Sequence, residues 1–211
     1  MRISRLVIWI AAAGIVVAAC GGATTPAATG EDQPAPTTQN SSADVETATM
    51  ELSGRIETID AAIEAWRGAT SVAEAQAAAE TAANLVVGPN GPGFGDRDGD
   101  GVVGGSSDLG LLPGSDGAPA GLAAALETNE CVVSDVLGGT WTDPGARWDE
   151  MLSAIDRWRP DNNTMPSLAS HPMRIVGWAS FSMESDSLSE IQTFGGHANI
   201  HVKVSLRALD C

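Results

Sequence analysis

The chain has 211 residues, and its 27 acidic residues outnumber its 11 lysines and arginines, so the formal net charge at pH 7 is −16. A negative surplus of this size repels nucleic acid phosphates and anionic lipid headgroups, which disfavours binding to DNA, to RNA or directly to a membrane surface. Divalent cations are the natural counter-charge for such a chain.

The first twenty residues have the pattern of a secretion signal. Arg2 and Arg5 precede an apolar run from Leu6 to Val16, which is shorter than the ~20 residues that a membrane-spanning helix needs. Val17-Ala18-Ala19-Cys20 resembles the lipobox of bacterial lipoproteins. The resemblance implies a signal peptide over 1–19, lipidation (palmitate) of the Cys20 sulfur, and an extracytoplasmic protein whose membrane partner is bound through this lipid. A plain secretory signal and a short transmembrane anchor are the alternatives.

A tether and one domain are predicted after the signal. Removal of residues 1–19 takes away two arginines and no acids, so nine basic and 27 acidic residues remain, a balance of −18. Residues 20–43 are mostly small and polar and have no apolar periodicity, so we expect a flexible tether from the lipidated cysteine. Gly21 gives no signal for retention in an inner membrane, so an outer membrane, where the cell has one, is an alternative address. Residues 44–211 suffice for a single helical domain with a core.

Two amphipathic helices are predicted at the start of this domain. From Val45, apolar residues recur at alternating steps of four and three as far as Trp66, and Gly68 ends the pattern. Ser71-Val72-Ala73-Glu74 is a capping box that opens an alanine-rich helix, which ends at Gly88-Pro89. The alanine face lets a neighbouring helix approach closely, and we therefore expect an antiparallel helical hairpin.

The next segment, 88–117, is rich in glycine, proline and aspartate, and a loop of this length in a compact domain usually has a function. Within it, Asp96-Arg97-Asp98-Gly99-Asp100-Gly101-Val102-Val103 resembles the calcium loop of EF-hand and dockerin modules. The resemblance implies a calcium-type loop at 94–108. Its Ca²⁺ ligands would be the carboxylates of Asp96, Asp98 and Asp100 and the carbonyl oxygen of Val102, with Val103 packed inward.

The match departs from the calcium-loop pattern at its twelfth position, where Ser107 stands instead of an acid. Asp108 follows directly and supplies the last ligand if the loop is one residue longer than usual. An acidic surface turn that binds nothing tightly is the alternative, but three carboxylates within five residues repel one another without a cation. Extracellular calcium modules have dissociation constants of about 10⁻⁴–10⁻³ M, which suits a structural ion.

Further helices are predicted in the second half of the chain. A short helix at 119–128 is extended by residues 131–137 before Gly138 breaks it, and a helix capped by Asp143 starts with Pro144. Its predicted buried face consists of Trp148, Met151, Leu152 and Ile155. A mostly buried helix follows at 172–184.

The C-terminal segment has two interpretations. Residues 200–207 alternate like a strand, whereas the capping box Ser187-Leu188-Ser189-Glu190 and a polar stripe at helical spacing favour a helix. If this segment is a helix, the sequence predicts an all-α bundle of about six helices. The alternative is an α+β fold with a C-terminal strand at 199–208.

Cysteines and histidines are the other candidate functional residues. After lipidation of Cys20, only Cys131 and Cys211 remain, and two cysteines outside the cytosol usually form a disulfide; two free thiols are the alternative. His197 and His201 are four residues apart and, with His171, would chelate a transition metal or haem. The alternative role for these histidines is in the core or in a groove, satisfied by hydrogen bonds.

Gly195 and His197 also resemble the Gly-x-His-x-x-Glu motif of imelysin-like envelope proteins, which are helical bundles linked to iron uptake. Ile200 stands where that motif has its glutamate, so the resemblance does not supply the complete ligand set.

No catalytic motif is found in the sequence: neither Gly-x-Ser-x-Gly, nor a phosphate loop, nor His-Glu-x-x-His. We therefore expect a non-enzymatic, calcium-stabilised binding or interaction module of the cell envelope, whose protein or small-molecule partner and oligomeric state the sequence does not indicate. A transition-metal or haem protein is the first alternative. A hydrolase that uses surface carboxylates with calcium is a weaker one, because no paired carboxylate spacing supports it.

Overall fold

The computed structural model describes residues 42–105 and 107–211. The predicted signal peptide, the lipidation site Cys20 and nearly all of the predicted tether lie outside these residues. The described residues form five α-helices and three short helical segments without a β-strand. The predicted all-α bundle is therefore confirmed, and the alternative with a strand at 199–208 is wrong.

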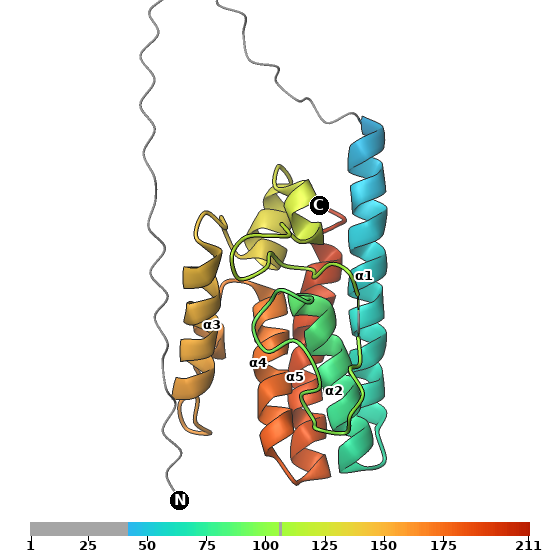
Figure 1. Cartoon of the computed structure of the whole chain (residues 1–211), viewed down its shortest axis with the longest axis vertical. Helices are drawn as coiled ribbons and strands as arrows, with labels where there is room; N and C mark the ends of the chain where they lie inside the picture. The colour runs from blue at the N-terminus through green and yellow to red at the C-terminus, as the bar shows by residue number, and fades with distance from the viewer. Residues whose placement is uncertain (1–41, 106) are drawn as a thin grey trace, which may run out of the picture. The chain divides into compact units, whose positions relative to one another are not determined.

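Four helices form an antiparallel bundle, in which each helix contacts at least two of the others (Figure 1). They are α1 (Ser42–Gly68), α2 (Val72–Val87), α4 (His171–Glu184) and α5 (Leu188–Arg207). A fifth helix, α3 (Pro144–Arg157), lies outside the bundle and packs against α4. No helix among the described residues is long and apolar enough to cross a membrane.

The α1–α2 hairpin forms as its sequence predicts. The apolar stripe of α1 is completely buried from Leu52 to Trp66, and the Trp66 indole nitrogen donates to the carbonyl oxygen of Ile191 on α5 at 2.8 Å. The Ser71 hydroxyl caps α2 by accepting from the amide nitrogen of Glu74 at 3.2 Å. Because the Glu74 carboxylate accepts from the amide of Thr70, this capping box reaches one residue further back than the usual pattern.

The connection between the two helical pairs differs from the sequence expectation. The predicted helix at 119–128 is a short 3₁₀ segment, η1 (Leu122–Leu126), and residues 131–137 do not extend it but form a separate π-helical turn, η2 (Val132–Leu137). A disulfide joins Cys131 to Cys211, with their Cα atoms 6.1 Å apart, so the predicted pairing is confirmed. It attaches the C-terminus of the chain to the beginning of η2.

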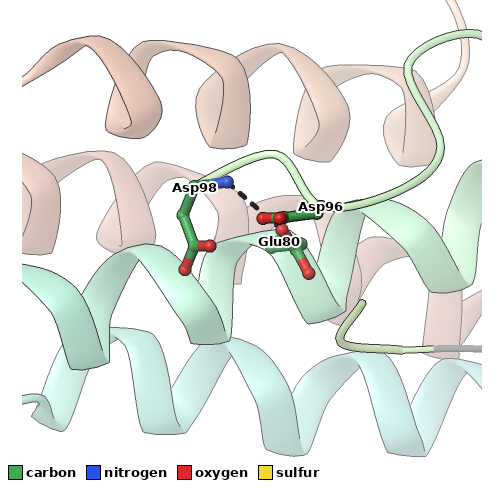
Figure 2. A group of neighbouring side chains, drawn as sticks. All are labelled: Glu80, Asp96 and Asp98. Atoms are coloured by element: carbon green, nitrogen blue, oxygen red, sulfur yellow. Dashed lines mark hydrogen bonds between the residues drawn. The ribbon is translucent and has the colours of Figure 1, made fainter. Parts of the chain in front are cut away.

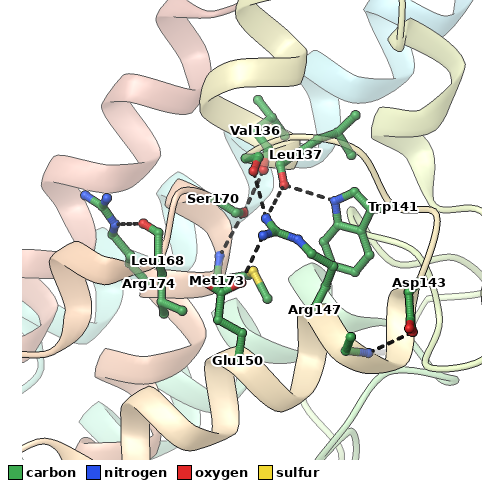
Figure 3. Close-up of polar contacts among 12 residues, drawn as sticks. Val136, Leu137, Trp141, Asp143, Arg147, Glu150, Leu168, Ser170, Met173 and Arg174 are labelled. Carbon is green, nitrogen blue, oxygen red and sulfur yellow. Dashed lines mark hydrogen bonds and ion pairs between the residues drawn. The ribbon is translucent and has the colours of Figure 1, made fainter.

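The carbonyl groups at the end of η2 are bound by side chains from the following helices (Figure 3). Arg147 on α3 donates to the carbonyl oxygens of Leu137 at 3.3 Å and Gly138 at 2.8 Å. Ser170, which caps α4, donates its hydroxyl to the carbonyl oxygen of Val136 at 2.7 Å. Side chains thus satisfy the acceptors that a helix end leaves unpaired.

The start of α3 is also as predicted, since the Asp143 carboxylate accepts from the amide of Ala146 at 3.0 Å and Pro144 is the first helical residue. Trp148 and Met151 are buried, but Leu152 is 47% exposed, so its assignment to the buried face is wrong. Because α3 contacts the bundle through α4 alone among the long helices, it buries a narrower stripe than a helix inside the bundle.

Candidate metal centre

Two buried polar residues of α2 organise the long loop that follows it. Glu80 is 2% exposed and Asn84, one turn later, is completely buried, although the rest of this helix face consists of alanines and other apolar residues. A buried polar group is tolerated when hydrogen bonds replace its water contacts. For both residues, most of these bonds are made with the backbone of residues 95–104.

Asn84 ties together the two ends of this loop segment. Its amide nitrogen donates to the carbonyl oxygen of Gly95 at 2.9 Å and to that of Gly104 at 2.8 Å. Its side-chain oxygen accepts from the Gly95 amide at 3.3 Å and from Nε of Arg97 at 3.2 Å. The segment between Gly95 and Gly104 is therefore closed into a loop on the surface of α2.

Glu80 lies against the Asp-rich turn within this loop. One carboxylate oxygen accepts from the amide of Gly104 at 2.6 Å, and the other accepts from the amides of Asp98, at 3.2 Å, and Arg97. Figure 2 shows Glu80 on α2 and the two aspartates on the loop that crosses it, with the Asp98 amide directed at the glutamate. Three backbone donors thus hold a buried carboxylate beneath the turn.

Glu80, Asp96 and Asp98 together form a group that could hold a metal ion, because each offers a carboxylate oxygen and these oxygens lie within 4.8 Å of one another. The group extends from the interior to the surface, since Glu80 is buried, Asp98 is partly buried and Asp96 is exposed. Oxygen-only donors of this kind suit a hard divalent cation.

Hydrogen bonds to backbone amides fix the aspartates of the turn. Asp96 accepts from Gly99 at 2.7 Å and, through its other oxygen, from Gly101 at 2.9 Å. Asp98 accepts from Asp100 at 3.1 Å. These short-range bonds turn the backbone so that carboxylates two residues apart approach one another.

The electrostatics of the turn reflect this crowding. Partial burial raises the pKa of Asp98, and repulsion by Asp100, Glu80 and Asp96 raises it further, against the lowering effect of the hydrogen bond from the Asp100 amide. Burial lowers the pKa of Arg97 to about 10, although the negative charge of Glu80 opposes that change. Arg97 is therefore a local counter-charge of Glu80. Among the described residues, neither Asp96 nor Asp98 forms an ion pair with a cationic side chain.

The loop approaches α2 so closely that a side chain would not fit at its return point. Gly105 has φ +68°, and a Cβ there would lie 2.4 Å from the carbonyl oxygen of Thr81. Both the left-handed backbone and the contact require glycine. The glycine content that marks this segment as a loop is thus also what lets it lie against α2.

The predicted calcium ligands divide into two sets. Asp96 and Asp98 belong to the carboxylate group, whereas Asp100 and the exposed Asp108 lie outside it, and Asp100 accepts from the amide of Val102 at 2.7 Å. Val103 is 41% exposed, so its predicted inward packing is wrong. In an EF-hand a helix follows the calcium loop, whereas here the loop continues without a helix. Val103 therefore has no helical core against which to pack.

Glu80 is the residue that the sequence interpretation missed. It lies 16 residues before Asp96 and outside the loop motif. The available signal was an acid and an amide at i and i+4 on an alanine-rich helix face, where apolar residues were expected. A buried acid on such a face needs a partner elsewhere in the chain.

The histidines form a second, smaller polar site between α4 and α5. Nδ1 of His171 and Nδ1 of His201 are 3.0 Å apart, which fits a hydrogen bond between two neutral rings. Burial, and then repulsion by His171, Arg174 and His197, lowers the pKa of His201 to about 3. Burial, followed by repulsion from Arg174, also lowers the pKa of His171, and Asp135 acts in the opposite direction.

His197 does not join this pair. It is exposed and stacks on Trp178, with ring centroids 4.5 Å apart. Among the described residues, the three histidines do not form a group that could bind a metal through three side chains. The structure therefore brings together two of the three predicted transition-metal ligands.

Comparison with protein-family models, with curated proteins and with solved structures finds no match to this chain. The described part of the chain combines an all-α bundle with a carboxylate group that could hold a metal ion.

Proposed function

We propose that this protein is a non-enzymatic lipoprotein of the cell envelope, in which a structural calcium ion orders a long loop on a helical binding module. The observation that carries the calcium proposal is the buried carboxylate of Glu80 directly beneath Asp96 and Asp98. Glu80 takes the place of the acid that the loop lacks at its twelfth position, and it supplies this ligand from α2 instead of from a following helix.

Further features support calcium over other cations. The side-chain ligands are all carboxylate oxygens, and the glycine-rich turn tolerates the irregular geometry that Ca²⁺ accepts, whereas Mg²⁺ would require a more regular octahedron. The predicted location outside the cytosol provides calcium at concentrations that a weak site needs. Carbonyl oxygens such as that of Val102, and water, would complete the coordination.

Calorimetric titration of the metal-free chain tests this proposal. We expect binding of Ca²⁺ with a dissociation constant of about 10⁻⁴–10⁻³ M and weaker binding of Mg²⁺. Asp96→Asn and Glu80→Gln should each abolish the calcium heat. Asp149→Asn, which removes an exposed carboxylate from α3, should leave it unchanged. Absence of calcium heat in the unmodified chain would rule the site out.

Lipid attachment is a separate part of the proposal and rests on the lipobox. Expression in a bacterial host should give a membrane-associated protein whose N-terminal peptide carries a lipid on Cys20 in mass spectrometry. Cys20→Ser should release the protein from the membrane fraction. A soluble protein with an unmodified Cys20 would contradict this part alone.

A transition-metal site is the second candidate, and the 3.0 Å approach of His171 to His201 favours it. Two imidazole nitrogens at this separation could bind one Zn²⁺ or Cu²⁺ ion, whose bonds to nitrogen are about 2.0–2.1 Å long. It ranks second because two ligands hold such an ion weakly and because Arg174 repels cations there. Calorimetric titration with Zn²⁺ tests it in the unmodified chain and in His201→Gln, and an absence of zinc heat in the unmodified chain would rule this site out.

A further inference from the structure

The end of α3, the end of α4 and the start of α5 together line a cleft. The cleft has a volume of about 540 Å³ and opens where the end of α3 meets the turn between α4 and α5. This volume is within the range of small-molecule sites. None of the residues that line the cleft belongs to the carboxylate group on α2 or to the histidine pair.

Aromatic rings form the apolar wall of this cleft. Trp158 stacks on Phe181 with ring centroids 4.4 Å apart and meets Phe194 edge-on at 6.0 Å. Trp178 lies behind Phe194 and stacks on it at 5.8 Å. Phe181 and Phe194 are buried and pack against Trp158, whose half-buried ring is the more exposed part of this wall. These three rings come from a chain of only nine phenylalanines and tryptophans.

Carboxylates dominate the rim of the same cleft. Asp156, Glu184 and Glu190 are exposed and line it, against one cationic residue, Arg159. Among the described residues, no ion pair joins Arg159 to an acid; its guanidinium donates instead to the carbonyl oxygen of Asp156 at 2.8 Å. Glu190 accepts from the Ser185 hydroxyl at 2.7 Å, and the other two carboxylates have no hydrogen-bond partner in the described part of the chain.

We propose that this cleft binds a small organic cation, an amine or a quaternary ammonium compound. Aromatic faces attract cations through their quadrupole and favour weakly hydrated organic cations in particular. The rim adds a negative potential, and the net charge of −16 concentrates cations near the surface in general. A neutral apolar ligand would use the rings and leave the carboxylates without a role.

Choline and its neutral isostere 3,3-dimethylbutan-1-ol provide the matched pair of probes. Titration of the whole chain, followed by nuclear magnetic resonance of the tryptophan indole N–H groups, should show saturable binding of choline that shifts the Trp158 signal. The isostere should bind roughly 2- to 30-fold more weakly, the range expected for a cation–π contribution.

Two charge-neutral variants test the role of the rim. Glu184→Gln and Asp156→Asn should each weaken choline binding roughly two- to fivefold without changing the affinity for the isostere. Asp149→Asn makes the same change at an exposed position of α3 outside the cleft and should have no effect. All of these substitutions are at exposed positions, so the variants should fold.

The outcome is separable from that of the calcium proposal when the titrations are made both in excess calcium and in chelator. Choline binding in both conditions supports the cation site whether or not calcium binds. Equal affinity for choline and the isostere would overturn the proposal in favour of an apolar site. No shift of the Trp158 signal with either probe would also overturn it, as would unchanged choline affinity in both rim variants.

Discussion

Two carboxylates of the candidate metal centre have contrasting environments. Glu80 is buried and accepts three backbone hydrogen bonds, whereas Asp98 is partly exposed and its pKa is raised by burial and by like charges. Hydrogen bonds from amides stabilise a buried carboxylate, but they do not remove the repulsion that it exerts on Asp98. A divalent cation would offset this repulsion, so one bound ion would account for both the buried carboxylate of Glu80 and the position of Asp98 beside it.

The Asp98→Asn variant should separate the cost of this charge from its benefit. The pKa of Asp98 is higher in the folded chain than in the unfolded chain, so ionisation of Asp98 destabilises the cation-free fold. This loss of stability develops as the pH rises through the folded-state pKa. In chelator at neutral pH, the variant should therefore be equally stable or more stable by about a few tenths of a kcal/mol. Its amide oxygen can still accept the hydrogen bond from Asp100.

In millimolar calcium the unmodified chain should be more stable than Asp98→Asn, because only the unmodified chain is stabilised by calcium. Urea unfolding in both conditions measures the difference, with Asp149→Asn as the control. A variant that is less stable in chelator, yet still stabilised by calcium, would contradict the role assigned to Asp98.

The His171–His201 pair should make stability sensitive to mild acid. The folded-state pKa of His201 is lowered from 6.5 to about 3, so between these values the unfolded chain binds a proton that the folded chain does not. Stability is therefore complete above about 6.5 and is lost as the pH falls. The loss has a limit of about 1.4 kcal/mol per pH unit for one group, and partial exposure of His201 reduces it.

His201→Gln should flatten this dependence. Urea unfolding just above and below the ordinary histidine pKa of about 6.5, where most carboxylates remain ionised, measures it. His197→Gln, an exposed position on the same helix, is the control. If His201→Gln and the unmodified chain lost equal stability, protonation of the pair would not be the cause.

At the scale of elements, α2 is both a wall of the bundle and the support of the loop. Its alanines pack in the core, while Glu80 and Asn84 hold the loop backbone. Arg55 of α1 adds a third attachment by donating to the hydroxyl of Ser107 at 3.2 Å. A segment without regular structure is thus fixed by side chains of two helices.

Asn84→Ala should release this loop. The substitution removes hydrogen bonds to both ends of the segment and leaves the partly buried carbonyl groups of Gly95 and Gly104 without this donor. Loss of a hydrogen bond costs about 0.5–1.5 kcal/mol, and an unpaired group that water cannot reach costs more. Limited proteolysis should then cut within 88–117, and urea unfolding should show the loss of stability. Asn90→Ala, at an exposed position of the same loop, should have little effect on either measurement. A variant as resistant to proteolysis as the unmodified chain would contradict the proposed anchoring.

The sequence predicted the helices well because the signals for their ends are local. Ser71 and Asp143 form the cap hydrogen bonds expected of them. The helix at 188–207 forms despite its strand-like pattern, although Ser187 makes no side-chain cap hydrogen bond and the predicted capping box there is wrong. The carboxylate group was predicted only in part, since the contact of Glu80 with Asp98 depends on the path of the intervening loop. The four-residue spacing likewise suggested that His197 and His201 act together. In the structure, the packing of α4 against α5 pairs His201 with His171 instead.

At the scale of the whole molecule, the disulfide connects the C-terminus to the middle of the chain. Cys131 and Cys211 are 80 residues apart, so the bond closes a loop that contains α3, α4 and α5. In the chain-entropy account, a loop of this length restricts the unfolded state by about 4–5 kcal/mol.

Reduction should therefore lower the melting temperature of the protein. A Cys131→Ser, Cys211→Ser double variant should melt at the lower temperature with or without reductant, and this insensitivity shows that the reductant acts through the bond. Scanning calorimetry measures both. An unchanged melting temperature on reduction would show that the bond does not stabilise the fold.

The most direct test of the calcium proposal is a crystal structure of the protein grown in millimolar calcium. We expect an ion within about 2.3–2.6 Å of carboxylate oxygens from Glu80, Asp96 and Asp98, with its identity confirmed by anomalous scattering. The same three carboxylates bound only to backbone amides and water, with no ion between them, would contradict the proposal.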